Sequence, residues 1–173
     1  MKSPVYFASL VARSDQESTI AKVQRLFDAA GFSSCVHKRD RTAIKLHFGE
    51  LGNDSFISPV FVRQVVEKVK AAGALPFITD TNTLYLGSRS NAVDHITTAV
   101  LHGFDYAVVG APVIIADGLC GKNVAQVKID KKHFATVSIA GDIVAADSMV
   151  RGRTKRKPVF PPTFRAAMLV TES

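Results

Sequence analysis

The feature that most constrains the fold is a regular alternation of apolar, strand-like segments with amphipathic, helix-like segments. β-Branched and aromatic residues dominate the strand-like segments, which span residues 5–12, 42–48, 75–79, 105–110 and 112–116. Helical spacing of apolar residues fills most of the gaps between them. This order is typical of a sheet whose strands run mostly parallel. We therefore predict an α/β fold, with a mostly parallel sheet and helices on both of its faces.

Start and stop signals mark three helices between these strands. In the first, Ser14 and Glu17 have the spacing of a capping box, and Gly31 stands where a left-handed C-cap belongs. The second begins at Ser58 with Pro59 in its first turn. Its expected buried stripe consists of Val62, Val65, Val66 and Val69. For the third, either Ser88 or Ser90 is the expected cap, and the expected buried stripe consists of Val93, Ile96, Thr97 and Val100.

The pattern changes after Asp117. Residues 123–129, 133–140 and 143–150 are short alternating segments, and the turn-forming residues "DKK" and "GD" separate them. We predict a C-terminal β hairpin or meander that follows the α/β body.

The net charge of +7 is concentrated at the C-terminal end. Residues 151–173 contain six Lys or Arg and one Glu, so the other 150 residues have a net charge of only +2. A nucleic-acid interface would be expected to spread basic side chains over a folded face, so nucleic acid is an unlikely partner. We predict an α/β domain at residues 1–150 and a basic, Pro-rich, disordered tail at residues 151–173.

Cysteine content and hydropathy favour the cytoplasm. Cys35 and Cys120 are far apart and form no CxxC motif, which is typical of thiols in a reducing compartment. No apolar run approaches the roughly 20 residues of a membrane-spanning helix, so no membrane association is expected. The apolar N-terminal stretch is interpreted as a first strand rather than a secretion signal.

The segment at residues 42–48 raises the main chemical question. Strand alternation puts Ile44, Leu46 and Phe48 on one face, and Lys45 and His47 on the other. If this strand is central, the ammonium and imidazole groups need partners, because an unpaired buried charge costs several kcal/mol. If it lies at an edge, both groups reach water.

Acidic residues follow several of the predicted strands. Glu50, Asp80 and Asp117 all lie near strand carboxyl ends, where ligand sites of open parallel sheets form. A Lys, a His and carboxylates that meet there would suit an anionic ligand or a divalent metal. We name His47, Glu50 and Asp117 as candidate metal ligands, with Lys45 and Asp80 as ligand-binding residues.

A polar segment at residues 79–91 is the second candidate. The side chains of Thr81, Asn82, Ser88 and Arg89, together with backbone N–H groups at the following helix start, could hold a phosphate or carboxylate. The alternative is ordinary turn chemistry with a helix cap. No P-loop or GxGxxG motif is present, so no nucleotide is indicated. His95, in the following helix, is either a core or a ligand histidine.

The blocks "KLHFGE", "TDTNTLYLGSR" and "ADGL" resemble the domain of unknown function 362 family. Many members of that family are described as iron–sulfur cluster-binding or ferredoxin-associated, and the resemblance covers about residues 4–150. It implies an α/β domain that is followed by a segment rich in His, Lys and Gly, and in many members by a ferredoxin-like module with four-iron four-sulfur centres.

Here the basic sequence "RGRTKRKPVFPP" stands in place of that continuation, and the two cysteines cannot bind such a cluster. We therefore expect a truncated or frameshifted member of the family, whose α/β domain binds a small anionic ligand or metal. The alternative is a non-catalytic scaffold module for a ferredoxin-like domain or redox partner. No specific reaction is predicted.

Overall fold

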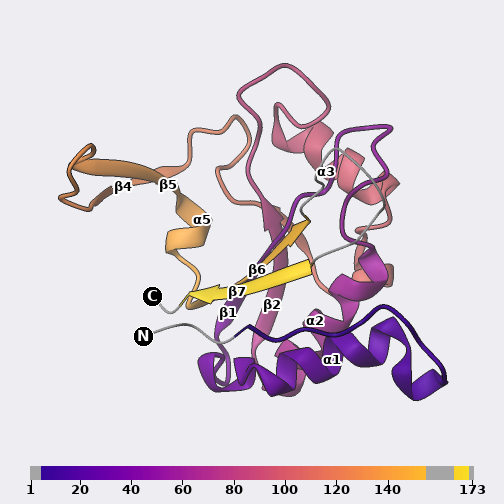
Figure 1. Cartoon of the computed structure of the whole chain (residues 1–173). Helices are drawn as coiled ribbons and strands as arrows, with labels where there is room; N and C mark the ends of the chain where they lie inside the picture. Colours follow the sequence, from indigo (N-terminus) through magenta and orange to yellow (C-terminus); the bar gives the residue numbers. More distant parts are fainter. Residues whose placement is uncertain (1–4, 155–165, 172–173) are drawn as a thin grey trace.

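The protein is described by a computed structural model that covers residues 5–154 and 166–171 (Figure 1). Its centre is a five-stranded sheet in the order β3-β2-β1-β6-β7. The strands are β1 (Arg41–Lys45), β2 (Leu75–Asp80), β3 (Val113–Ile115), β6 (Ser148–Thr154) and β7 (Ala166–Thr171). The first four are parallel, and β7 pairs antiparallel with β6. The α/β prediction with a mostly parallel sheet is confirmed.

One face of the sheet carries the main hydrophobic core. Ile44 of β1 lies in register with Ile78 of β2 and with Val150 of β6, and all three side chains are buried. They belong to one apolar cluster with residues of the helices α1 (Thr19–Ala29), α2 (Pro59–Ala71), α3 (Ala92–Leu101) and α4 (Tyr106–Val109). Two short 3-10 helices, η1 (Asp15–Glu17) and η2 (Phe32–Cys35), flank α1.

Helix α2 forms as its sequence predicts. Ser58 is the N-cap and Pro59 occupies the first turn, where the missing N–H of proline costs nothing. The predicted stripe Val62, Val65, Val66 and Val69 is buried. Burying each valine side chain contributes about 1.5–3 kcal/mol, so this stripe fixes the helix on the sheet.

A smaller unit lies toward the opposite face of the sheet. The antiparallel hairpin of β4 (Val124–Lys128) and β5 (Thr136–Ala140) projects from the body, and the short helix α5 (Gly141–Val144) links it to β6 (Figure 1). Residues of β5 and α5 lie beside Thr79 and Met149, whose neighbours Ile78 and Val150 face the helical core. The predicted hairpin is confirmed, and helices occupy both faces unequally.

The strand order contains a topological switch point between β1 and β6. The chain moves in one direction along the sheet from β1 through β2 to β3, and then returns to place β6 on the other side of β1. The connections on either side of this point therefore leave toward opposite faces. In open α/β sheets, the crevice outside the strand carboxyl ends at such a point is where ligands bind.

Three predictions of local structure are wrong. Residues 5–12 form no strand, and Val5 and Phe7 are exposed; the Val11 carbonyl accepts a hydrogen bond from Lys22 in place of a strand partner. Residues 105–110 contain the helix α4, because the Asp105 side chain caps it and Gly110 ends it in the left-handed region. Residues 143–150 do not extend the hairpin, since they form part of α5 and of the central strand β6.

Two predicted helix starts are also shifted. The Glu17 carboxylate accepts from the Arg13 backbone N–H, and Ser18, instead of Ser14, caps α1. Helix α3 is capped by Asn91, whose side chain accepts from the Asp94 N–H. Neither Ser88 nor Ser90 has this role, because the chain reaches helical geometry only at Ala92.

The orientation predicted for α3 is wrong. Val93, Ile96 and Val100 are exposed, and the buried residues of the helix are Ala92, His95, Thr98 and Ala99. The small alanines let the helix approach the core closely. Thr98 donates to the Ser88 carbonyl at 3.1 Å, and His95 lies 3.9 Å from Asp80. The partners of these two polar side chains, the Ser88 carbonyl and Asp80, thus lie on the side of α3 that is buried.

Strands of the central sheet lie on both sides of the predicted boundary at residue 150. Strand β6 continues past residue 150 to Thr154, and β7 lies within the range predicted as tail. Residues 155–165 and 172–173, on which the disorder prediction also falls, lie outside the described residues. The division into a domain and a tail stays a prediction.

Candidate ligand-binding site

A cavity of about 290 Å³ opens at the carboxyl ends of the parallel strands. It lies at the switch point between β1 and β6, and residues of β5 and α5 form part of its lining. Its lining consists of Lys45, Thr79, Asp80, Thr81, Ala116, Ser138, Ile139, Ala140, Ile143, Met149 and Arg151. The sheet topology therefore places the cavity where this class of fold binds ligands.

Three charged side chains line the cavity. Lys45 and Arg151 occupy paired positions on the neighbouring strands β1 and β6. Lys45 Nζ lies 2.9 Å from Asp80 Oδ1, whereas Arg151 is exposed and has no ion pair with any described residue. Two cations thus face one carboxylate, which gives the lining a net positive charge.

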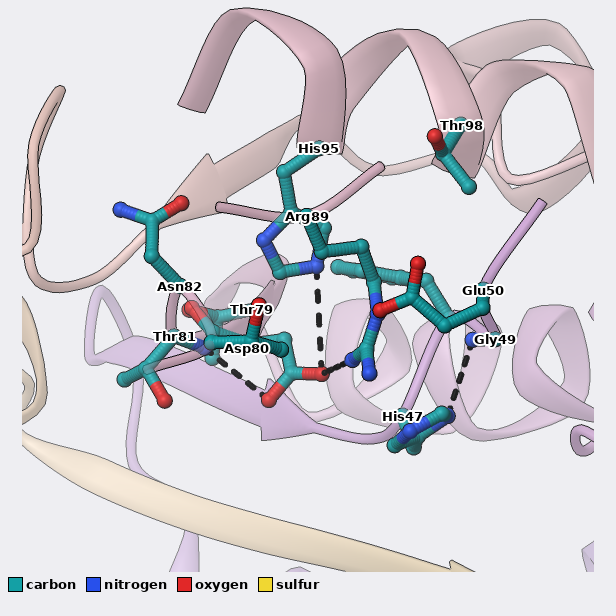
Figure 2. Close-up of polar contacts among 12 residues, drawn as sticks. His47, Gly49, Glu50, Thr79, Asp80, Thr81, Asn82, Arg89, His95 and Thr98 are labelled. Carbon is teal, nitrogen blue, oxygen red and sulfur yellow. Dashed lines mark hydrogen bonds and ion pairs between the residues drawn. The ribbon is translucent and has the colours of Figure 1, made fainter. Parts of the chain in front are cut away.

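Asp80 is shared between this cavity and a polar cluster around the buried Arg89. Its Oδ1 contacts Lys45 and accepts from the Thr81 N–H at 2.9 Å, while its Oδ2 accepts from Arg89 Nη1 at 3.3 Å. Figure 2 shows Asp80 between Thr81 on one side and Arg89 and His95 on the other. The Asp80 charge is therefore already compensated from inside the protein by Arg89.

Arg89 organises this polar cluster, which we call the Arg89 cluster: Arg89, Glu50, Asp80, Tyr85 and Ser88. Only 4% of the Arg89 side chain is exposed. Its Nε donates to Glu50 Oε1 at 2.9 Å and its Nη2 donates to Tyr85 Oη at 2.8 Å. Tyr85 and Ser88 donate in turn to the two oxygens of Glu50, at 2.8 and 2.7 Å. Each charge in the cluster has a partner, which the buried Arg89 and Asp80 in particular require.

Glu50 is held as a carboxylate by this network. Burial alone would raise its pKa, but hydrogen bonds from Ser88, Tyr85 and Arg89 outweigh that effect and lower the pKa to about 2. A β-carbon at Gly87 would lie only 3.2 Å from Glu50 Oε2, so the close approach of this turn favours glycine. Glu50 is therefore occupied within the protein and is poorly placed to bind a ligand.

His95 lies behind Asp80, fully buried in the core. Its Nε2 is 3.9 Å from Asp80 Oδ2, and its ring packs edge-on against Phe48 at 5.6 Å (Figure 2). Neither ring nitrogen has a hydrogen-bond partner among the described residues. Burial lowers the pKa of His95 to about 4, against the opposing attraction of Asp80. His95 is therefore a neutral core histidine at neutral pH.

His47 does not turn inward with Lys45. Strand β1 ends at Lys45, the His47 side chain is exposed, and its Nδ1 accepts from the Gly49 N–H at 2.9 Å (Figure 2). Burial of part of the ring, followed by repulsion from Arg89, lowers the pKa of His47 below its usual 6.5. Of the two polar groups on this face, only Lys45 finds the carboxylate partner expected for a central strand.

Asn82 and Asp117 form a separate pair beside the cavity. Asp117 accepts from the Asn82 backbone and side-chain amides at 3.0–3.1 Å. Asn82 also donates to the Gly118 carbonyl at 2.8 Å. This pair connects the loops that follow β2 and β3, and neither residue lines the cavity.

The side chains that the structure describes form no recognisable metal or iron–sulfur site. Within residues 5–154 and 166–171, no group of three or more His, Cys, Asp or Glu side chains is placed to hold a metal ion. The structure does not bring His47, Glu50 and Asp117 together as a metal site. Cys35 lies in η2 and Cys120 in the loop after β3, and two thiols fall short of the four that iron–sulfur centres use.

The candidate residues thus separate into three groups, with His47 outside them all. Lys45, Asp80 and Thr81 line the cavity, Ser88 and Arg89 hold Glu50 in place, and Asn82 pairs with Asp117. Sequence reasoning missed Arg151, Tyr85 and the apolar cavity wall. Arg151 was assigned to a basic tail, and only the pairing of β6 with β1 reveals its place beside Lys45.

Comparison with known proteins identifies one family. Residues 42–152, well over half of the chain, match the family described as "Domain of unknown function (DUF362)". No curated protein and no solved structure matches the sequence. No helix in the described part of the chain has the length and hydropathy to cross a membrane. The matched range includes every residue of the cavity lining and of the Arg89 cluster, and the chain belongs to the DUF362 family.

Proposed function

We propose that this domain binds a small anionic ligand in the cavity at the carboxyl ends of β1, β2 and β6. The observation that carries the proposal is the position of Arg151. Arg151 is the register partner of Lys45 on the neighbouring strand, lines the cavity and has no ion pair with a described residue. Arginine presents its donors in a planar fork that suits a carboxylate or phosphate.

The neighbouring groups support this role. The Asp80 carboxylate would repel an anion, but its charge is compensated by both Lys45 and Arg89. Lys45 can therefore keep its ion pair and still contribute positive potential to the cavity. Thr81 and Ser138 line the same cavity, and a hydroxyl group can donate a hydrogen bond to a ligand.

Calorimetric titration of the purified domain with butyrate and with inorganic phosphate tests the proposal. We expect saturable binding that weakens at higher salt, because the attraction is electrostatic. Arg151→Gln should lower the affinity by about tenfold, whereas Arg63→Gln, on the exposed surface of α2, should leave it unchanged. Equal affinities of the two variants would contradict the assignment of Arg151.

A second candidate function is that of a docking module, which a different observation favours. Val93, Ile96 and Val100 are exposed on α3, and Leu84 and Leu86 are almost fully exposed on the preceding loop. Val93, Ile96 and Val100 recur at helical spacing, and exposed apolar side chains on one helix face are typical of protein–protein interfaces. The family resemblance suggests a ferredoxin-like partner that carries the iron–sulfur cluster, in a reducing cytoplasm.

Binding to a purified four-iron four-sulfur ferredoxin tests the docking function. We expect Val100→Asp to weaken such binding and Val144→Asp, which changes another exposed valine, to leave it intact. If no binding occurs, or if both substitutions have the same effect, α3 is not the docking surface.

A further inference from the structure

We infer that the cavity accepts a small amphipathic organic anion with a single negative charge, such as a short aliphatic carboxylate. This inference rests on the proposed anion-binding function and specifies the class of ligand. It is carried by the contrast between the charged end of the cavity, at Lys45 and Arg151, and its apolar wall.

The apolar wall is assembled from several parts of the chain. Ala116 follows β3, Ile139 and Ala140 belong to β5, Ile143 belongs to α5, and Met149 belongs to β6. Ile139, Ile143 and Met149 are only half-buried although they lie around one cavity. An apolar ligand body would remove the remaining surface from water, which favours its binding.

The charge of the lining sets the ligand charge. Lys45 and Arg151 face Asp80 alone, so the charged side chains of the lining sum to +1. A monoanion neutralises this excess, whereas a polyanion would meet the Asp80 carboxylate without further cations to balance it. The helix at the cavity, α5, has only four residues, and no Gly-rich phosphate-binding motif is present in the sequence. These features favour a carboxylate over a phosphate ester or nucleotide.

The size of the cavity limits the ligand further. A volume of about 290 Å³ is at the lower end of the range of small-molecule sites. It suits a short chain or one small ring attached to the anionic group. The guanidinium of Arg151 would bind the carboxylate, and Ile143 and Met149 would contact the apolar body.

Titration with a chain-length series distinguishes this inference from the proposed function. The probes are acetate, butyrate and hexanoate, with inorganic phosphate and hexan-1-ol for comparison, at constant ionic strength. We expect the affinity to rise by about fourfold for each methylene that enters the cavity. Hexanoate should bind at least tenfold more tightly than phosphate or hexan-1-ol.

The outcomes of this titration distinguish the proposed anion-binding function from the inferred preference for an amphipathic monoanion. If acetate, hexanoate and phosphate bind equally, or phosphate binds best, the site is an anion site without an apolar specificity, and the inference is wrong while the proposed function stands. If no anion binds, both are wrong. Tight binding of hexan-1-ol alone would indicate an apolar pocket and would also contradict both.

Substitutions in the wall locate the effect. Met149→Gln keeps approximately the side-chain volume, and Ile143→Thr replaces much of the apolar side chain with a hydroxyl group. Each should reduce the gain from acetate to hexanoate without changing acetate affinity. Ile96→Thr, on the exposed face of α3, should retain the full gain. The amide NMR spectrum of each variant verifies the fold. An unchanged gain in both folded wall variants would overturn the inference.

Discussion

The protein contains two arrangements of cationic side chains at neighbouring places, and they differ in how completely their charges are paired. In the Arg89 cluster, an almost fully buried guanidinium contacts two carboxylates and a tyrosine. At the cavity, Lys45 pairs with Asp80, which also contacts Arg89, and Arg151 has no acidic partner among the described residues. Asp80 belongs to both arrangements. The comparison indicates that the first stabilises the loops and that the second is available to a ligand.

The largest expected effect is on the Arg89 cluster. Arg89→Met leaves the Glu50 and Asp80 carboxylates without their shared cation, and we expect it to lower the free energy of unfolding by about 3–5 kcal/mol. Urea denaturation measures the loss. The control is Arg63→Met, which removes an exposed ion pair with Glu67 and should cost less than about 1 kcal/mol. Similar losses in both variants would contradict the structural role of the cluster.

The second effect is a dependence of stability on pH through His95. Because the folded pKa of about 4 lies below the usual 6.5, the unfolded chain binds a proton more readily, and stability falls as the pH is lowered from 6.5 toward 4. The full loss is about 3 kcal/mol, and about 2 kcal/mol of it should appear between pH 7 and pH 5. The lowered pKa of Glu50 adds a further loss in the same direction, between about pH 4.5 and 2.

Substitution of His95 isolates its share of this pH dependence. In His95→Leu, the free energy of unfolding should change much less between pH 7 and pH 5 than in the wild type. His37→Ala, which changes an exposed histidine, should retain the wild-type slope. An unchanged slope in His95→Leu would show that the buried imidazole is not the titrating group.

The third prediction tests the cavity side of the comparison. Arg151→Gln should change the free energy of unfolding by less than about 0.5 kcal/mol, because an exposed side chain without an ion pair contributes little to stability. Its loss of butyrate affinity should be about tenfold, or about 1.4 kcal/mol. Denaturation and calorimetry on the same sample compare the two. If Arg151→Gln lost much stability and still bound butyrate normally, Arg151 would have a structural role and no role in ligand binding.

The smallest effect concerns the start of α3, the helix that carries His95 into the core. Asn91→Ala removes the side chain that caps the Asp94 N–H and should cost about 1 kcal/mol in urea denaturation. Ser90→Ala is the matched control, since the Ser90 side chain makes no hydrogen bond with the described residues, and it should be nearly neutral. A larger loss of stability in Ser90→Ala than in Asn91→Ala would show that Ser90 is the N-cap, as one of the two sequence predictions has it.

Local patterns were enough to predict much of the fold. The valine stripe of α2, its Ser58-Pro59 start and the hairpin all depend on residues close together in sequence. Residues 5–12 have strand propensity but no strand partner. Residues 105–110 contain a helix instead of a strand because Asp105 caps its start and Gly110 ends it. Helix α3 was assigned the wrong buried face, because the polar side chain of His95 packs inward beside Asp80, and helical periodicity cannot show such a partner.

Of the candidate site, only the residues at the carboxyl ends of the strands could be predicted from the sequence. Lys45 and Asp80 follow from the rule that ligand sites of parallel sheets form at strand carboxyl ends. The separation of Arg89 from the cavity depends on its contacts with Glu50 and Tyr85. Arg151 depends on the pairing of two strands that are distant in the chain. Such long-range pairings have no signature in a single sequence.

The most direct test of the central claim is an amide NMR titration of the isotope-labelled protein with hexanoate. The account predicts saturable shifts centred on Lys45, Thr81, Ile139 and Arg151, with a common dissociation constant, and a loss of these shifts in Arg151→Gln. Shifts confined to the exposed face of α3, or no saturable shifts at the strand carboxyl ends, would contradict it.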